Sequence, residues 1–199
     1  MLAELGAVLS AAPGPVDRAV YAAAIIEGNC LEKPTASTRR ISNQRLAELY
    51  ALNPFVVIFR VLRKLWEVDP QARPLLATLV ALARDPLFMA SATPVLSQPA
   101  GVEIQRAPIR DALHKLVGER MNDATLDKVV RNVSSSWTQS GHLQGRTFEF
   151  RQRVQARKPA AFPSHSANAA AVGGWAGPIT IEVHNILPSG IVIQSIDIK

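Results

Sequence analysis

The clearest hydrophobic pattern of the chain lies between residues 122 and 139. Its apolar side chains recur three and four positions apart, which places on one helical face Leu126, Val129, Val130, Val133 and Trp137. Asp123 is a good cap for the start of this helix, and Ser140-Gly141 supplies the glycine that favours its end. Away from the apolar face point Lys128, Arg131 and Asn132.

Strand-like alternation follows this helix. Phe148, Phe150 and Gln152 fall on one side of an extended chain, and the other side carries Glu149, Arg151 and Arg153. We therefore predict a short, basic β-hairpin. A helix followed by such a hairpin resembles the recognition helix and wing of a winged helix-turn-helix.

Helical spacing also runs through the first part of the chain. It predicts a helix over 2–11 and another over 16–31, the second burying Ala19, Val20, Ala23, Ile26 and Cys30. Thr35 or Ser37 can cap the next helix, whose apolar face consists of Ile41, Leu46, Leu49 and Leu52.

Three further helices are predicted to begin where proline follows Asn or Asp, at Asn53-Pro54, Asp69-Pro70 and Asp85-Pro86. The first would bury a broad stripe of Val57, Ile58, Val61, Leu62, Leu65 and Trp66. It would leave outside Arg60, Arg63 and Lys64. The second is apolar on nearly all sides, which predicts the central helix of a bundle.

From residue 86 the predicted order is helix, strand at 102–104, helix, turn, helix, strand, wing and strand. The helix before the turn would bury Ile109, Leu113, Leu116 and Val117. This is the order of elements in a winged helix-turn-helix. We predict a mainly α protein, with an N-terminal helical bundle at 1–84, a winged helix-turn-helix at 85–158, and a linker with a C-terminal β-hairpin at 159–199.

The net charge of +6 is unevenly distributed. Residues 1–103 contain ten Lys or Arg and nine Asp or Glu, whereas residues 104–158 contain eleven and five, and residues 159–199 contain one and two. The excess lies in the segment with the predicted recognition helix and hairpin, which favours a phosphate backbone as partner. A basic segment alone is more often a solvated surface, so the coincidence with the winged-helix pattern carries this interpretation.

The sequence contains no pattern typical of catalysis or of metal or cofactor binding. The four histidines have no i, i+4 partner or neighbouring cysteine: His114, His142, His165 and His184. His142, at the corner between helix and wing, is expected to be a surface or phosphate-contacting residue. The single cysteine, Cys30, is expected to be a small core residue. We therefore expect a non-enzymatic protein without metal or cofactor.

The sequence also lacks the apolar run of ~20 residues that a membrane helix needs. Its first residues include an acid and no basic stretch, which is typical of a helix and not of a signal peptide. A cytoplasmic protein with no membrane partner is the expectation.

The segment from Ile25 to Arg157 resembles the BrxA family, small proteins of BREX bacteriophage-exclusion systems. The matching features are a polar helix start with the apolar face after it, a continuous helical block, and the helix end before a basic wing: Thr35-x-Ser37-Thr38-Arg39-Arg40 with Leu46/Leu49-Tyr50, Leu75–Ala83 with Asp85-Pro86-Leu87, and Ser136–Leu143. The tail after Pro159 departs from the usual end of the family. The resemblance implies a helical part similar to the NusB RNA-binding fold, a winged-helix part, and double-stranded DNA binding without known enzymatic activity.

We expect the recognition helix to direct toward the major groove Thr125, Lys128, Arg131 and Asn132. The wing would hold phosphates or enter the minor groove through Arg146, Arg151 and Arg153. Arg39 and Arg40 are either a second backbone contact or ordinary surface residues. The expected partners are double-stranded DNA and other phage-defence proteins.

Two other functions stay open. One is a protein–protein adaptor whose basic surface meets an acidic partner, and the other is an RNA-binding factor, by analogy with the NusB-like part. The sequence sets neither a DNA site nor an oligomeric state.

Overall fold

The computed structural model describes residues 1–145, 149–154, 179–181 and 196–198. The chain divides into two compact units, Met1–Pro159 and Ala160–Lys199. The predicted boundary between residues 84 and 85 falls inside the first unit. The protein is mainly helical, as predicted, and its described residues also form two small antiparallel sheets of two strands each.

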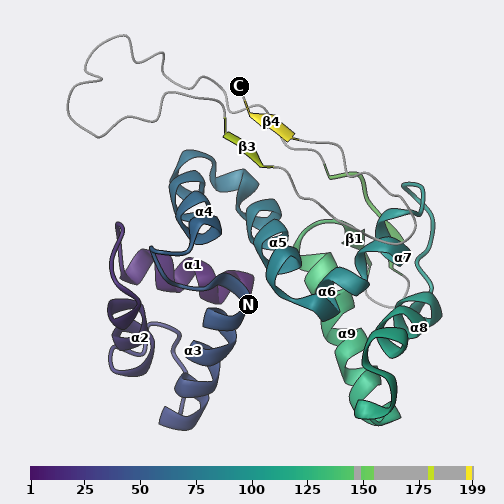
Figure 1. Ribbon diagram of the computed structural model, residues 1–199, viewed down its shortest axis with the longest axis horizontal. Coiled ribbons are helices and arrows are strands. Elements are labelled where there is room, and N and C mark those ends of the chain that lie inside the picture. Colours follow the sequence, from purple (N-terminus) through teal and green to yellow (C-terminus); the bar gives the residue numbers. More distant parts are fainter. Residues whose placement is uncertain (146–148, 155–178, 182–195, 199) are drawn as a thin grey trace. The chain divides into compact units, whose positions relative to one another are not determined.

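The first unit opens with a run of helices, α1 (Leu2–Ala11), α2 (Arg18–Ile26), α3 (Ala36–Tyr50), α4 (Val57–Val68), the 3-10 turn η1 (Pro70–Ala72) and α5 (Arg73–Arg84) (Figure 1). A capping box starts α3, because the Thr35 hydroxyl accepts the N–H of Thr38 and the Thr38 hydroxyl accepts the N–H of Thr35. Asp69 accepts the N–H of Gln71 at 2.9 Å and so begins the turn that leads into α5.

Helix α5 lies at the centre of the first unit. It packs against α3 and α4 of the N-terminal helices and against α6 and α9 of the later ones, as Figure 1 shows. Its small residues Ala77 and Ala81 are buried, which lets neighbouring helices approach closely. The prediction of a central helix is confirmed.

The second half of this unit contains α6 (Pro86–Ala90), α7 (Ala92–Leu96), α8 (Arg106–Val117), the 3-10 turn η2 (Gly118–Arg120) and α9 (Asp123–Gln139). Asp85 begins α6 by accepting the N–H groups of Leu87 and Phe88 at 2.9 and 3.3 Å. One helix was predicted after Asp85, but the chain forms two short ones, and the Ser91 hydroxyl between them donates to the Phe88 carbonyl at 2.6 Å.

Two short strands follow α9, β1 (Leu143–Gln144) and β2 (Phe150–Arg151), paired antiparallel with Leu143 opposite Arg151. The predicted strand at 102–104 forms a single bridge, between Glu103 and Phe150. Backbone hydrogen bonds extend this contact, from the Ile104 N–H to the Glu149 carbonyl at 2.7 Å and from the Arg151 N–H to the Val102 carbonyl at 2.8 Å. The segment before α8 is therefore anchored along β2.

The described part of the second unit consists of β3 (Ile179–Ile181) and β4 (Ile196–Ile198), which pair antiparallel with Ile179 opposite Ile198. This pairing agrees with the predicted C-terminal hairpin. The turn predicted at 187–190 lies outside the described residues.

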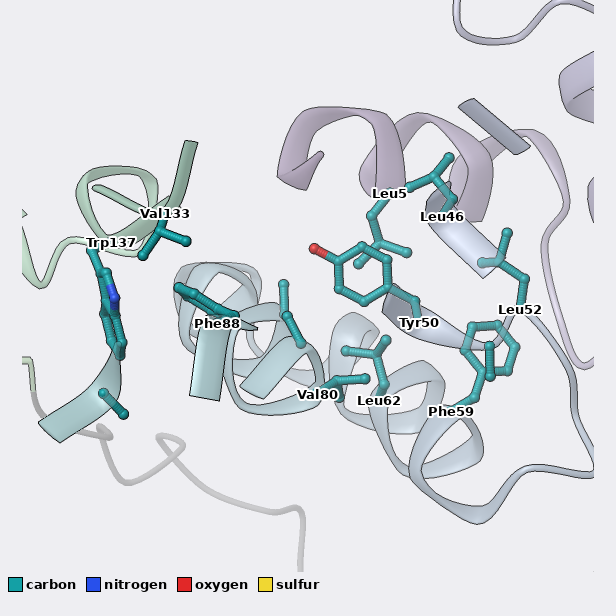
Figure 2. Close-up of a cluster of buried hydrophobic side chains, with 14 of the residues drawn as sticks. Leu5, Leu46, Tyr50, Leu52, Phe59, Leu62, Val80, Phe88, Val133 and Trp137 are labelled. Atoms are coloured by element: carbon teal, nitrogen blue, oxygen red, sulfur yellow. The ribbon is translucent and has the colours of Figure 1, made fainter. Parts of the chain in front are cut away.

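A continuous hydrophobic core runs through the first unit (Figure 2). The N-terminal helices contribute Leu5, Leu46, Tyr50, Phe59 and Leu62, the loop after α3 contributes Leu52, and the later helices contribute Phe88, Val133 and Trp137. Trp137 is fully buried, its indole N–H donates to the Ser91 hydroxyl at 2.9 Å, and its ring packs against Phe88 at 4.8 Å. The end of α9 is therefore fixed to the junction of α6 and α7.

The predicted buried face of α2 is wrong in part. Ala19 and Val20 are exposed, whereas Tyr21 and Ile25 are buried. The Tyr21 ring packs edge-on against Phe59 with centroids 5.5 Å apart, and this contact sets the rotation of the helix. A helix rich in alanine leaves its own rotation weakly specified, so the aromatic contact decides it.

Helix α4 begins later than predicted. The Asn53 carboxamide accepts the N–H of Phe55 at 2.9 Å, which holds Pro54 in a turn, and the helix starts only at Val57. Val57 is consequently exposed, although it was predicted to be buried.

Arg63, predicted to lie outside, is buried with 8% of its surface exposed. Its guanidinium donates to the carbonyl oxygens of Gly14 and Ala12 at 3.3 and 3.4 Å and so links α4 to the loop after α1. Two other residues predicted to be buried, Ile41 and Leu116, are exposed.

Candidate nucleic-acid interface

Helix α9 has the buried and exposed faces that its sequence predicts. Leu126, Val130, Val133 and Trp137 are buried, and Val129 is half-buried. The opposite face exposes Thr125, Lys128, Arg131 and Asn132. The N-cap lies one residue earlier than predicted. The Asn122 carboxamide, and not Asp123, accepts the N–H of Thr125 at 2.9 Å.

The carboxylates of α9 are paired with an arginine of the preceding helix. Arg110 on α8 donates from its Nη2 atom to Asp123 and from its Nε atom to Asp127 at 3.0 Å. These hydrogen bonds, to Asp127 and then Asp123, raise the pKa of Arg110. In the part of the chain that the structure describes, no acidic group pairs with Lys128 or Arg131. The exposed face of α9 is therefore cationic.

The predicted wing arginines occupy different environments. Arg153 is exposed, and Arg146 lies outside the described residues. Arg151 is half-buried, with Nη1 at 3.5 Å from the His142 carbonyl and a buried Nε atom. Burial lowers the pKa of Arg151. Its guanidinium is directed toward the protein and not outward as predicted.

His142 is a buried residue, so its expected role as a surface or phosphate-contacting residue is wrong. Only 8% of its surface is exposed, its Nδ1 atom lies 2.8 Å from the Ser140 hydroxyl, and its ring packs edge-on against Trp137 at 5.1 Å. Burial, and then the charge of Arg151, lowers the pKa of His142 to about 4. The imidazole is neutral near pH 7 and belongs to the packing at the end of α9.

The two arginines at the start of α3 also separate. Arg39 donates from Nη1 to the Ile26 carbonyl at 2.8 Å, which closes the C-terminal end of α2. This engagement is neither of the roles predicted for it. Arg40 is exposed on α3, whose main neighbours are α2 and α5.

A groove of about 570 Å³ lies between the N-terminal helices and α9. Its apolar lining includes Leu49, Tyr50, Phe88 and Val133, and Figure 2 shows the Tyr50 oxygen directed to the side on which Phe88 and Val133 lie. Burial, and then the charge of Glu4, raises the pKa of Tyr50 to about 12, so its hydroxyl stays protonated at neutral pH.

One wall of this groove is polar and comes from α9. It consists of Asn132, Ser135, Ser136 and Gln139, and α3 adds Arg45. Asn132 thus belongs both to the cationic face of α9 and to the groove. Sequence reasoning missed the groove because its walls come from helices far apart in the chain, and no local pattern marks it.

The described residues contain no group of three or more His, Cys, Asp or Glu side chains placed to hold a metal ion. Within those same residues, no helix has both the length and the apolar character required to cross a membrane. Comparisons with protein-family models, curated proteins and solved structures found no match to this chain.

Proposed function

We propose that this chain is a non-enzymatic double-stranded DNA-binding component of a BREX-type phage-defence assembly. The observation that carries the DNA-binding part is the exposed face of α9, where Lys128 and Arg131 lie without an acidic partner among the described residues. Asp123 and Asp127, the carboxylates that would repel phosphate, are already paired with Arg110. Such a helix is suited to a negatively charged groove.

The order of elements supports a winged helix-turn-helix as the binding unit. Helices α6 and α7, the segment hydrogen-bonded to β2, then α8, α9, β1 and β2 follow one another as they do in that motif. In this proposal α9 is the recognition helix, and helices α1 to α5 are the NusB-like part that the resemblance to BrxA implies.

The proposed contacts follow from exposure and chemistry. Lys128 and Arg131 neutralise phosphates or bond guanine, and the Asn132 carboxamide can bond the N6 and N7 atoms of adenine. Thr125 lies on the same exposed face. Arg153 contacts the backbone from the wing, and Arg40 offers a second backbone contact. Arg146, which lies outside the described residues, is proposed for the same role as Arg153 from its place in the sequence alone. Arg39, Arg151 and His142 act through the fold, because each is engaged inside the protein.

The test is a salt series of duplex DNA binding, measured by fluorescence anisotropy on the full chain and on Lys128→Ala/Arg131→Ala. Each lost phosphate contact reduces the log–log slope by ~0.9, so the double variant is expected to show a slope shallower by about 1.8 and weaker binding at every salt concentration.

The matched control is Arg60→Ala/Lys64→Ala, which removes two cations of α4 that are also exposed. It should leave affinity and slope unchanged. An unchanged slope in the α9 variant, or tighter binding of a structured RNA than of duplex DNA in competition, would reject α9 as a duplex-binding helix.

The phage-defence part is tested separately. Genes for a methyltransferase, a large ATPase and an alkaline-phosphatase-like protein should lie beside this one. In a host that carries such a system, the Lys128→Ala/Arg131→Ala variant should reduce protection in a plaque assay. Full protection would contradict a role for α9 in defence.

A further inference from the structure

Helix α4 carries a second apolar stripe on the side opposite its core contacts. Phe59, Leu62 and Trp66 are buried on its inner side. On the outer side, Val57 is 62% exposed, Val68 is 50% exposed and Val61 is half-buried. Spacings of four and seven residues align these valines over three turns of the helix. Phe55, 82% exposed, lies just before the first of them.

Two cations border this stripe. Arg60 and Lys64 are exposed on the outer side of α4, and neither pairs with an acid within residues 1–145 and 149–154. The nearby carboxylate of Glu67 lies 3.4 Å from Arg63 and is therefore engaged. The outer face of α4 is thus apolar along one edge and positively charged along the other.

Scattered exposed apolar residues are ordinary on a protein surface, but an aligned set with a charged border is typical of a helix-docking face. Helix α4 packs mainly against α5 and η1, and Figure 1 shows α5 beside it. We propose that the outer face of α4, formed by Phe55, Val57, Val61 and Val68 with Arg60 and Lys64, docks an acidic amphipathic helix of a partner protein.

Charge selects this occupant over a second copy of the chain. The protein has a net charge of +6, and two apposed α4 faces would bring together four cations that have no acidic partner among the described residues. An anionic membrane surface is disfavoured as well, because valines are short and two cations attract such a surface weakly. A helix with apolar residues at three- and four-residue spacing and glutamates beside them matches both edges of the face.

The test uses the full chain, labelled with ¹⁵N, and a synthetic helix-forming peptide of about five turns. The peptide carries leucines at three- and four-residue spacing on one face and glutamates beside them. Addition of the peptide is expected to shift amide resonances of residues 55–68 in a saturable manner. Val57→Asp/Val68→Asp should weaken binding about tenfold or more, because it places carboxylates in the apolar stripe. The matched control Ile41→Asp, at a position on α3 that is 55% exposed, should bind normally.

Charge reversal sharpens the test. Arg60→Glu/Lys64→Glu should lose the glutamate peptide and bind a version with lysines in place of the glutamates. Circular dichroism verifies that each variant keeps its helix content. The proposal is overturned if the shifts fall outside α4 or no saturable binding occurs. It is also overturned if the unmodified chain binds both peptides equally.

Two further measurements on the unmodified chain address the rejected occupants. Sedimentation of phosphatidylcholine/phosphatidylglycerol vesicles should leave the chain in solution. Sedimentation equilibrium should not reveal a dimer that depends on the α4 face, that is, one that disappears in the Val57→Asp/Val68→Asp variant. Either result, if positive, would assign the α4 face to a membrane or to a second copy instead.

Discussion

Several arginines of this protein are anchored to backbone carbonyl oxygens close to helix ends. The contacts run from Arg39 to Ile26, from Arg63 to Ala12 and Gly14, from Arg73 to Trp66, from Arg84 to Glu48, and from Arg120 to Val117. The last carbonyls of a helix have no hydrogen-bond donor within it and carry the negative end of its dipole. A guanidinium supplies both the missing donors and a favourable positive charge. These side chains are consequently less available to phosphate than their charge suggests.

His142 makes the stability of the protein depend on pH. Its pKa is lowered to about 4 in the folded chain, whereas an unfolded chain binds the proton with a pKa near ~6.5. Between these values the unfolded state holds more protons, so the free energy of unfolding falls as pH decreases from ~6.5 toward 4, by at most about 1.4 kcal/mol per pH unit. Urea unfolding at several pH values measures this loss.

The control for this prediction is His142→Gln, which cannot titrate. Its stability should decline less steeply over the same pH window. If the two chains lost stability in parallel, His142 would not be the group that responds.

At the level of elements, the start of α9 depends on one side chain. Asn122 accepts the N–H of Thr125 at 2.9 Å and so satisfies a donor that the helix leaves open. Asn122→Ala should therefore lower the free energy of unfolding by about 1 kcal/mol, and Asn122→Asp should retain most of it. Chemical denaturation monitored by circular dichroism measures both changes. An alanine variant as stable as the aspartate variant would show that the cap contributes nothing.

Elements also differ in how firmly their own sequences set their rotation. The apolar spacing of α9 is long and regular, and its buried face agrees with the prediction through Leu126, Val130, Val133 and Trp137. In α4 the Asx turn at Asn53 delays the helix start, and the burial of Arg63 against backbone carbonyls leaves Val57 outside. A polar side chain can be buried when a neighbouring element supplies hydrogen-bond partners for it. The apolar pattern of one helix contains no information about those partners.

For the whole molecule, residues Met1–Pro159 form a compact unit with a core that runs from α1 to α9. A chain that ends after Pro159 should therefore fold alone, with a thermal midpoint within about 3 °C of the full chain. Circular dichroism on heating tests this, and duplex affinity should also be retained. Loss of a cooperative transition in the shortened chain would show that residues 160–199 are needed for the fold.

Part of the candidate site followed from the sequence and part did not. The exposure of Lys128, Arg131 and Asn132 followed, because helical periodicity places them opposite a strongly apolar face. The inward orientation of Arg151 and the burial of His142 did not, because both depend on packing at the end of α9 around Trp137. The groove lined by α3, α5 and α9 likewise required the arrangement of separate helices.

The amino-acid sequence by itself determined the mainly helical class, the capping of α3 and α6, the two faces of α9, and the concentration of positive charge after residue 103. These properties depend on residues only a few positions apart, so the local sequence is sufficient to predict them. Among the described residues, the tertiary structure decided which arginines are engaged by backbone carbonyls, where α4 leaves an apolar stripe exposed, and where the groove forms. The reason is that burial and hydrogen bonding of a side chain depend on what distant elements place beside it.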